Sequence, residues 1–341
     1  MSRFTRRFWI LSFALILFGL CYQFWDPIST HVLALVYNLP LPDNRDVDTY
    51  DFTTTEIEDL CLSGAHLNNL STETSIPNTV HYVIGLHDAE LSFLAYISIL
   101  TALKSLNPTT VKLHHTENLN ISNKYIQLLL QDDHVELVLH GASDVTSEMK
   151  LSSHFAHLAD VLRLKVLYSE GGIYLDSDVY ILQSFDALRN SSRDVVLGHE
   201  GGNRGGLCNA IIIARTGAAF IDRWIASYSD FSSGEWNNHS VLLPKQMAEK
   251  HPNEVCTLSP HAFFWPTWTR RHLKWMHEPL GKEEAIRAQE ILDTNKGSYF
   301  DGQLAYHSWN QLAWEPYLSK LTEEIIKRDD TRFNLIIRRF L

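Results

Sequence analysis

The order of hydrophobic and polar positions after residue 76 predicts strands and helices in alternation. Short, mostly apolar runs, which are typical of buried strands, lie at 79–85, 111–115 and 135–140. Longer runs with apolar residues on the helical period lie between them, at 90–106 and 122–131. This alternation predicts an α/β fold with a mostly parallel, doubly wound sheet, whose ligands bind beyond the carboxyl ends of the strands. We expect a single such domain over residues 76–341.

The stretch from 154 to 182 places charged residues inside an otherwise apolar helix. Its first part has apolar side chains on a 3.6-residue period, which predicts a mostly buried helix. The polar exceptions are Asp160 and Arg163, which at i and i+3 are neighbours on one side of the helix. Gly171-Gly172 follows and supplies a residue that takes positive φ, so the chain is expected to turn sharply into the next element.

That next element, residues 173–182, alternates with a period of two and predicts the next strand of the sheet. One face carries Tyr174, Asp176 and Asp178, so both carboxylates are expected to point the same way at the rim of the sheet. Two such carboxylates, without a cysteine or a close histidine pair, form a hard oxygen site suited to Mg²⁺ or Mn²⁺ rather than Zn²⁺. A metal of this kind usually completes its shell with substrate phosphates.

The N-terminus carries a candidate membrane anchor. Residues 8–25 are apolar apart from Ser12 and Gln23, and three arginines precede them. A run of this length is just enough to cross a bilayer, and the positive flank keeps the N-terminus in the cytosol. A cleaved signal peptide is the alternative, but bulky residues stand where its cleavage site needs small ones. We therefore expect a cytosolic tail at 1–7, a single-pass type II signal anchor at 8–25, and a lumenal remainder.

Residues 26–75 are polar and acidic with several prolines, a composition that resists a packed core and predicts a stem. This stretch contains a second Asp-x-Asp triplet, Asp46-Val47-Asp48, which lies in no strand pattern and is interpreted as solvated linker. Asn-x-Ser/Thr sequons occur at Asn69, Asn120, Asn190 and Asn238. Four sequons behind a membrane anchor fit a lumenal glycoprotein.

Composition narrows the possible partners. The formal net charge of -11 argues against nucleic acid, since phosphate binding requires a basic face. Of the four cysteines, Cys21 lies in the apolar N-terminal run. One internal disulfide is possible among Cys61, Cys208 and Cys256, and the sequence does not choose its partners. The sequence also leaves the oligomeric state open.

Two linked motifs surround the paired aspartates. The helix carries Ala159-Asp160-x-x-Arg163, and Tyr168-x-x-Gly171-Gly172-Ile173-Tyr174-Leu175-Asp176-x-Asp178 follows it. Together they resemble the DXD-containing sugar transferases of glycosyltransferase family 32. That family includes fungal α-1,6-mannosyltransferases, mannosyl-inositol-phosphorylceramide synthases, and animal α-1,4-galactosyl- and N-acetylglucosaminyltransferases. The resemblance implies a GT-A fold, a nucleotide-sugar donor, a divalent metal and retention of anomeric configuration.

The resemblance extends toward the C-terminus and implies how the metal is held. The segment LAYHSWNQ at 304–311 is similar to the family's closing His-x-Trp-Asn. His307 is therefore expected to complete the metal shell, and Trp309 to cover the bound nucleotide. Asp178 is expected to be the chief metal ligand, with Asp176 on the water or ribose side of the ion.

The same resemblance places further residues at the donor. Asp160 and Arg163 are expected to hold the donor sugar, because a carboxylate and a guanidinium both hydrogen-bond hydroxyls and their spacing forms a small clamp. Asn209 matches an asparagine that the family places near the donor sugar, and a turn-capping role is the alternative. Tyr174, which belongs to the motif itself, is assigned to the donor site as well.

Two further stretches are expected to border the pocket. Residues 198–214 carry four glycines in six positions before an apolar run, which predicts a mobile loop beside the sugar pocket and then a strand. The aromatic residues at 261–275 are either core or a candidate acceptor wall. The histidines near the first strands are interpreted as structural, namely His81, His87, His114 and His115.

The sequence thus predicts a retaining, metal-dependent hexosyltransferase of the Golgi or ER membrane. Its donor would be GDP-mannose, UDP-galactose or UDP-N-acetylglucosamine, its acceptor a glycan or a glycolipid, and its cofactor Mn²⁺ or Mg²⁺. One alternative is a glycoside hydrolase, whose carboxylates flank the bond from opposite sides, roughly 5 Å or more apart. The other is a non-catalytic partner subunit of another glycosyltransferase, which would carry a broken metal site.

Overall fold

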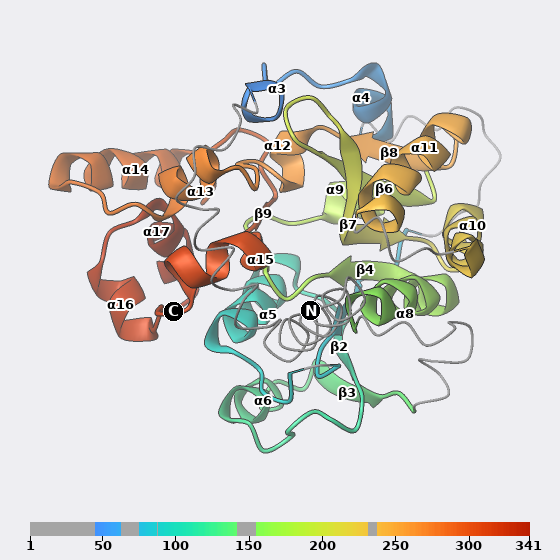
Figure 1. Cartoon of the computed structure of the whole chain (residues 1–341), viewed down its shortest axis with the longest axis horizontal. Coiled ribbons are helices and arrows are strands. Elements are labelled where there is room, and N and C mark those ends of the chain that lie inside the picture. The colour runs from blue at the N-terminus through green and yellow to red at the C-terminus, as the bar shows by residue number, and fades with distance from the viewer. Residues whose placement is uncertain (1–44, 63–74, 87, 142–154, 231–236) are drawn as a thin grey trace, which may run out of the picture. The chain divides into compact units, whose positions relative to one another are not determined.

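The computed structural model describes residues 45–62, 75–86, 88–141, 155–230 and 237–341 (Figure 1). Residues Arg45–Leu341 form one compact unit. The predicted cytosolic tail, the predicted signal anchor and the first part of the predicted stem lie outside the described residues. Among the helices that the structure describes, none combines the length and the apolar character that crossing a bilayer requires.

Seven strands of the described residues form one sheet in the order β3-β2-β1-β4-β7-β6-β8. Their bounds are β1 Thr79–Val83, β2 Thr110–His115, β3 Val135–Leu139, β4 Gly172–Leu175, β6 Val195–Glu200, β7 Gly206–Ala214 and β8 Val255–Leu258. Neighbours from β3 through β4 pair in parallel, as do β6 and β8, whereas β7 is antiparallel to both β4 and β6. The mostly parallel α/β sheet that the sequence predicts is therefore confirmed, and β4 joins it next to β1.

Helices connect the parallel strands as the hydrophobic pattern predicts. Along the chain, α5 (Phe93–Leu106) lies between β1 and β2, α6 (Lys124–Leu129) lies between β2 and β3, and α8 (Phe155–Glu170) precedes β4. Local signals set the ends of α5. The Ser92 hydroxyl accepts a first-turn amide hydrogen bond (3.2 Å), and Asn107 takes a left-handed φ of 45° after the last turn.

The turn after α8 requires both of its glycines. Gly171 and Gly172 have φ values of 68° and 109°, which side chains disfavour. A Cβ on Gly172 would lie 2.4 Å from the carbonyl oxygen of Thr79 in β1. The predicted sharp turn is confirmed, and the glycine pair lets β4 enter the sheet directly against β1.

The predicted single strand over 173–182 is wrong in one respect. The chain pairs in the main sheet as β4, turns at Asp176–Asp178, and continues as β5 (Val179–Ile181). β5 pairs antiparallel with β9 (Ala305–His307) in a separate two-stranded sheet. The break arises because the first amide of β5 donates to the carbonyl of Asp176 (3.1 Å), which closes a turn between the two sheets.

The remaining helices lie mostly in the C-terminal half of the chain. Their bounds are α9 Asp186–Arg189, α10 Ala219–Ser227, α11 Leu243–Lys250, α12 Pro260–Phe263, α13 Arg270–His277, α14 Lys282–Thr294, α15 Asn310–Ala313, α16 Glu323–Arg328 and α17 Arg332–Arg338. Buried side chains of α8 and α10 pack with those of β4, β6 and β7 into a hydrophobic core, in which Phe220 and Trp224 are fully buried. This core holds α8 against the strands that carry the predicted site.

A chain of three histidines crosses β1 and β2 and ends after β3. His81 Nε2 lies 2.9 Å from the Gly171 carbonyl oxygen, and His81 Nδ1 lies 2.9 Å from His114 Nε2. His114 Nδ1 in turn lies 2.8 Å from His140 Nε2. Because a carbonyl only accepts, neutral rings in this chain each donate through Nε2. Burial lowers the pKa of His114 to about 3, so its ring is neutral in the folded protein.

Residues 45–62, predicted as part of a stem, pack against the domain. They form α3 (Arg45–Asp48) and α4 (Glu56–Leu62), and α4 packs against β8 at the edge of the sheet (Figure 1). The Asp48 side chain is only 9% exposed and lies 3.2 Å from the Arg271 guanidinium. The interpretation of the Asp46–Asp48 triplet as solvated linker is therefore wrong for Asp48, because the fold supplies a partner that is distant in sequence.

Candidate metal and donor site

The turn between β4 and β5 carries both aspartates of the predicted metal site. The Asp176 amide donates to the carbonyl of Ala210 in β7 (2.9 Å), which fixes the start of the turn at the rim of the sheet. The carbonyl of Asp178 accepts from the Ser308 amide (2.9 Å) and from the Ser308 hydroxyl (3.1 Å). The two carboxylates are therefore placed by backbone contacts to two different sheets.

His307 reaches Asp178 through the pairing of β5 with β9, in which Val179 lies opposite His307. Nε2 of His307 is 3.1 Å from Oδ1 of Asp178. The other oxygen, Oδ2, accepts from the Asn310 amide (2.9 Å). The contact that the family resemblance implies is present, and the carboxylate is oriented by the segment that follows β9.

Burial is the largest influence on the ionisation of all three groups. It favours the neutral form of Asp178 and of His307, but their mutual attraction outweighs it. The pKa of Asp178 is therefore lowered, and the pKa of His307 is raised. For Asp176, burial prevails over the attraction of Arg163, and the pKa is raised. Asp178 and His307 thus each favour the charged form of the other, while Asp176 is the more basic of the two carboxylates.

The donor atoms of Asp176, Asp178 and His307 all lie within 4.8 Å of one another. An ion about 2.1 Å from each ligand requires ligand atoms roughly 3–4 Å apart, so small side-chain movements bring all three onto one cation. Two carboxylates and one imidazole suit Mn²⁺ or Mg²⁺. The residues present therefore fit the divalent cation that the sequence predicts.

Arg163 connects α8 to the aspartate turn. Its Nη1 lies 2.9 Å from Oδ1 of Asp176 and donates to the Asn209 carbonyl (2.9 Å), and its Nη2 lies 3.0 Å from Oδ1 of Asp160. The guanidinium also lies 4.5 Å from the centre of the Tyr174 ring. Arg163 is only 5% exposed, so these contacts occur in a buried environment where they strongly restrict the geometry.

The predicted donor residues differ in their access to the site. Nδ2 of Asn209 donates to Oδ1 of Asp160 (2.7 Å), which joins β7 to α8. The Tyr174 hydroxyl donates to Oδ1 of Asp176 (2.7 Å), and the ring is buried in the core behind the turn. Tyr174 does not line the cavity described next, and its polar contacts are with Asp176 and with the Arg163 guanidinium.

A cavity of about 390 Å³ lies over the aspartate turn, a size typical of small-ligand sites. Of the predicted site residues it is lined by Asp160, Arg163, Asp176, Asp178, Asn209, His307 and Trp309. The Trp309 ring centre is 4.1 Å from that of His307, and its Nε1 donates to the Pro266 carbonyl (3.2 Å). All the predicted site residues except Tyr174 are thus gathered around one cavity.

The cavity also includes residues that were not assigned to the metal or the donor. They are Glu200, Cys208, Ala210, Asn237, Ser240, Val241, Trp268, Asn310, Gln311 and Leu312. Glu200 ends β6, and burial raises the pKa of its carboxyl. It belongs to the segment predicted to border the pocket, but no motif distinguished it from the other acidic residues of the chain.

The glycine-rich loop between β6 and β7 is held by the N-terminal segment. The Gly202 amide donates to the carbonyl of Val47 (2.8 Å), and the Arg204 guanidinium donates to the carbonyl of Thr53. This loop, predicted to be mobile, is therefore anchored by residues of the 45–62 segment.

The aromatic stretch at 261–275, predicted to be either core or a wall of the acceptor site, contains residues of both kinds. Phe263 and Phe264 are fully buried and belong to the core. Trp268 is half-buried and lines the cavity. Trp268 is therefore the only aromatic residue of 261–275 that lines the cavity.

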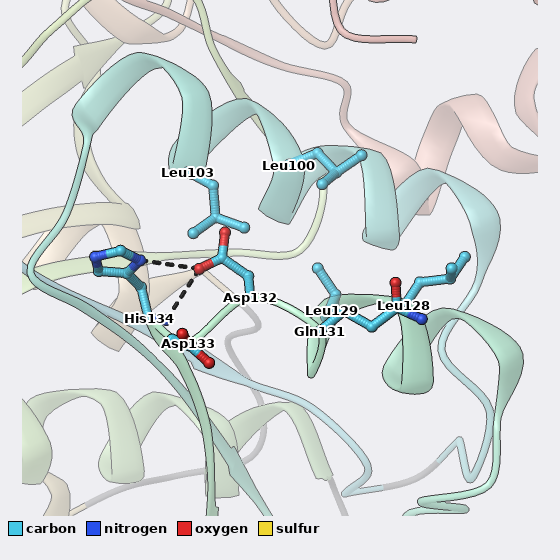
Figure 2. A pocket seen from close by; sticks show the side chains of 8 residues that line it. All are labelled: Leu100, Leu103, Leu128, Leu129, Gln131, Asp132, Asp133 and His134. Carbon is cyan, nitrogen blue, oxygen red and sulfur yellow. Dashed lines mark hydrogen bonds and ion pairs between the residues drawn. The ribbon is translucent and has the colours of Figure 1, made fainter.

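A second hollow, of about 500 Å³, shares no residue with this cavity (Figure 2). It lies between α5 and the turn from α6 to β3, with Leu100 and Leu103 on one side. Oδ1 of Asp132 accepts from both the amide and Nδ1 of His134 (2.9 Å each), so these polar groups close a turn. Asp132 and His134 therefore have a structural explanation, and Asp176, Asp178 and His307 lie in the other cavity.

Comparisons with known proteins agree with this site. A family model described as the glycosyltransferase sugar-binding region containing the DXD motif matches residues 100–195, which include α8 and both aspartates. The chain is similar to glucan organizing enzyme 1 of Cryptococcus neoformans var. grubii, at 38% identity over 285 residues that cover 78% of this chain and 71% of that protein.

Two solved structures are distantly similar. The PaToxG glycosyltransferase has 17% identity and a TM-score of 0.40, over 78% of this chain and 87% of that one. The glycosyltransferase GlyE of Streptococcus pneumoniae TIGR4 has 9% identity and a TM-score of 0.43, over 78% of this chain and 63% of that one. Since both TM-scores are below 0.5, these likenesses add nothing to the fold that the sheet topology defines.

Proposed function

Since this chain belongs to glycosyltransferase family 32, the DXD-motif sugar transferases, we propose that it transfers a hexose from a nucleotide sugar to a glycan or glycolipid with retention of anomeric configuration. The observation that carries the proposal is the convergence of Asp176, Asp178 and His307 within one cavity. Its mostly parallel sheet with connecting helices fits the GT-A type. The intact constellation also argues against a non-catalytic partner subunit.

Asp176, Asp178 and His307 would hold the divalent cation. When bound, Mn²⁺ or Mg²⁺ neutralises the charge that develops on the departing nucleoside diphosphate. The Asn310 amide orients one oxygen of Asp178, and the other oxygen faces His307. The protein thus fixes the ligand geometry before the donor binds, which lowers the reorganisation required at the moment of reaction.

The donor sugar would bind against α8 and β7. Asp160 and Asn209 are joined by a hydrogen bond and both line the cavity, where sugar hydroxyls would find an acceptor and a donor. Arg163 compensates the charges of Asp160 and Asp176 and holds both carboxylates in place. We therefore assign Arg163 a positioning role in addition to its predicted contact with the sugar.

The acceptor would approach from the side of Glu200 and Trp268. A half-buried indole offers an apolar surface on which a sugar ring stacks. The Glu200 carboxyl, made more basic by burial, would accept a hydrogen bond from the attacking hydroxyl. Transfer would occur on the face from which the diphosphate departs, so the main contributions of the protein are orientation and electrostatic stabilisation.

We further propose that the domain lies in the lumen of the Golgi or ER and that residues 8–25 anchor it. The apolar N-terminal run and the sequons support this placement, and Asn120 and Asn190 have exposed side chains in the structure. The donor would be GDP-mannose, UDP-galactose or UDP-N-acetylglucosamine. The name of the Cryptococcus relative, a glucan organizing enzyme, supports a glycan acceptor over a glycolipid.

The test is a donor screen followed by a transfer assay on the full-length protein. Thermal shifts with GDP and UDP sugars in the presence of Mn²⁺ would identify the donor, and NMR of the product would give its anomeric configuration. Asp178→Ala should abolish metal-dependent transfer. The matched control Asp46→Ala removes an exposed aspartate from the other Asp-x-Asp triplet and should leave transfer unchanged. Full turnover by D178A, or a product of inverted configuration, would contradict the proposal.

A further inference from the structure

We propose that Cys61 and Cys256 form a disulfide that links α4 to β8, the edge strand of the main sheet. The sequence allows three pairings among its non-anchor cysteines, and the fold distinguishes between them. In the structure Cys61 of α4 and Cys256 of β8 are free thiols in the packed interface of these two elements, close enough to interact with each other. Both are almost fully buried, at 1% and 0% exposure.

The surroundings of the pair hold the two elements in register. One turn before Cys61, the carboxylate of Glu58 accepts a hydrogen bond from the hydroxyl of Ser259, just after β8. The same Ser259 hydroxyl lies 3.1 Å from the carbonyl of Thr53. These contacts join α4 and the segment before it to the residue that follows β8, so the two thiols lie within a packed interface.

The third cysteine is unsuited to pairing with either of them. Cys208 lies in β7, lines the donor cavity and forms a hydrogen bond with Glu200. β6 lies between β7 and β8, so the backbone of Cys208 is roughly 10 Å from that of Cys256, beyond the reach of a disulfide, and Cys61 belongs to α4, which packs on β8. The structure therefore selects one pair and leaves Cys208 as a thiol.

Oxidation of the pair takes place while the thiols are still accessible to a dithiol/disulfide oxidant. The Cys61 thiolate would attack the disulfide of a dithiol/disulfide oxidant and form a mixed disulfide. The Cys256 thiolate then attacks the Cys61 sulfur and releases the oxidant as its dithiol. Two electrons and two protons pass from the cysteines to the oxidant, and one S–S bond forms for one broken.

This inference rests on the proposed lumenal location, because such disulfides persist in oxidising compartments and are rare in the cytosol. Since both thiols are buried once α4 has docked, oxidation must precede or accompany docking. The bond would close a long segment of chain between residues 61 and 256, and cross-links of this kind stabilise the folded state. It would make residues 45–62 a covalent part of the catalytic unit.

The direct test is thiol mapping on full-length protein expressed through a eukaryotic secretory pathway. N-ethylmaleimide added at lysis blocks free thiols, and trypsin places Cys61, Cys208 and Cys256 in three different peptides. We expect the Cys61 and Cys256 peptides to be linked until a reductant is added, and the Cys208 peptide to carry N-ethylmaleimide. Maleimide on both Cys61 and Cys256 in protein that transfers sugar would overturn the disulfide and leave the proposed function intact. Linked Cys61 and Cys256 peptides in protein that does not transfer sugar would support the disulfide and contradict the proposed function.

A melting experiment gives an independent readout. Because the bond is buried, dithiothreitol is added to protein unfolded in urea, which is then refolded in its presence. This treatment should lower the Tm of the wild type by roughly 5–15 °C and bring it close to that of the C61S/C256S double variant. The double variant itself should not respond to dithiothreitol. The matched control C208S should respond as the wild type does. Equal melting of the wild type with and without dithiothreitol would overturn the proposal, whether or not the serine variants fold.

Discussion

Nε2 of His307 lies 3.1 Å from Oδ1 of Asp178, although 129 residues separate the two in the chain. The backbone builds this contact, because β5 begins directly after Asp178 and β9 ends at His307. The two strands pair over three residues, and every residue of both is buried. The position of the imidazole is therefore set by packed secondary structure, which suits a ligand that must meet a metal at fixed distance.

Removal of the imidazole should weaken metal binding. His307→Ala is expected to reduce Mn²⁺ affinity by about 100-fold or more, since loss of a group that merely supports a ligand already costs 10–100-fold. Mn²⁺ titration followed by electron paramagnetic resonance, together with turnover at each metal concentration, measures the effect. His134→Ala, which removes an exposed imidazole outside the cavity, is the control and should bind Mn²⁺ normally. Wild-type affinity in H307A would exclude the metal role.

Arg163 should be essential for the stability of the site as well as for its activity. Arg163→Ala leaves the carboxylates of Asp160 and Asp176 without their shared counter-ion, which should cost about 3–5 kcal/mol of the free energy of unfolding. Arg163→Lys keeps the charge but loses the planar fork, so its stability should lie between those of R163A and the wild type.

Urea denaturation measures these differences. The control Arg287→Ala removes an arginine side chain that is 65% exposed, and its effect should stay within about 0.5 kcal/mol. If R163A were as stable as R287A, the buried network would not have the structural role assigned to it.

Glu200 should affect the attack of the acceptor and not the binding of the metal. Glu200→Gln is expected to lower kcat/KM by about 10–100-fold through loss of a hydrogen bond to a charged group, with Mn²⁺ affinity unchanged. Glu200→Ala with added azide separates two mechanisms. Transfer on one face predicts no rescue, whereas rescue with formation of a glycosyl azide would identify Glu200 as a covalent nucleophile and refute one-step transfer.

His114 should make the stability of the fold depend on pH. Its pKa is about 3 in the fold because of burial, against about 6.5 in an unfolded chain. Well above pH 6.5 the ring is neutral in both the folded and the unfolded protein, and its full contribution to the free energy of unfolding is present. As the pH falls below 6.5 the unfolded chain gains a proton that the fold does not, so stability is lost until about pH 3. By pH 5 the loss from His114 alone should be about 2 kcal/mol.

The variant His114→Gln tests this assignment. The amide group can donate to Nδ1 of His81, and it carries no titrating proton in this range. Urea unfolding at pH 7.5 and pH 5.0 should show that H114Q loses about 2 kcal/mol less between the two conditions than the wild type. Equal losses in both proteins would show that His114 does not titrate as its burial implies.

Local sequence was sufficient to predict most of the elements. The apolar runs predicted β1, β2 and β3 and the helices between them, because periodicity within a strand or helix is a property of neighbouring residues. The glycine pair predicted the turn into β4 for the same reason. The motif from Asp160 to Asp178 predicted the candidate site and the family, since its residues are close in sequence.

Tertiary structure decided what depended on distant pairing. Periodicity does not tell which strands pair, so it could not reveal that the chain breaks after Asp176 and that β5 joins β9 in a second sheet. For the same reason, periodicity could not predict that Glu200 of β6 reaches the cavity. It also could not predict that residues 45–62 pack against the domain, because their partners lie far along the chain.

The division follows from the range of the forces involved. By itself the sequence determined the α/β elements, the paired aspartates and the type of metal they suit, because hydrogen bonds and side-chain spacing within an element are local. Only the fold decided the position of His307 against Asp178, the access of Glu200 to the cavity, and the meeting of Cys61 with Cys256. These contacts between distant residues form only when the whole chain packs into one close-packed core, so they depend on the entire sequence.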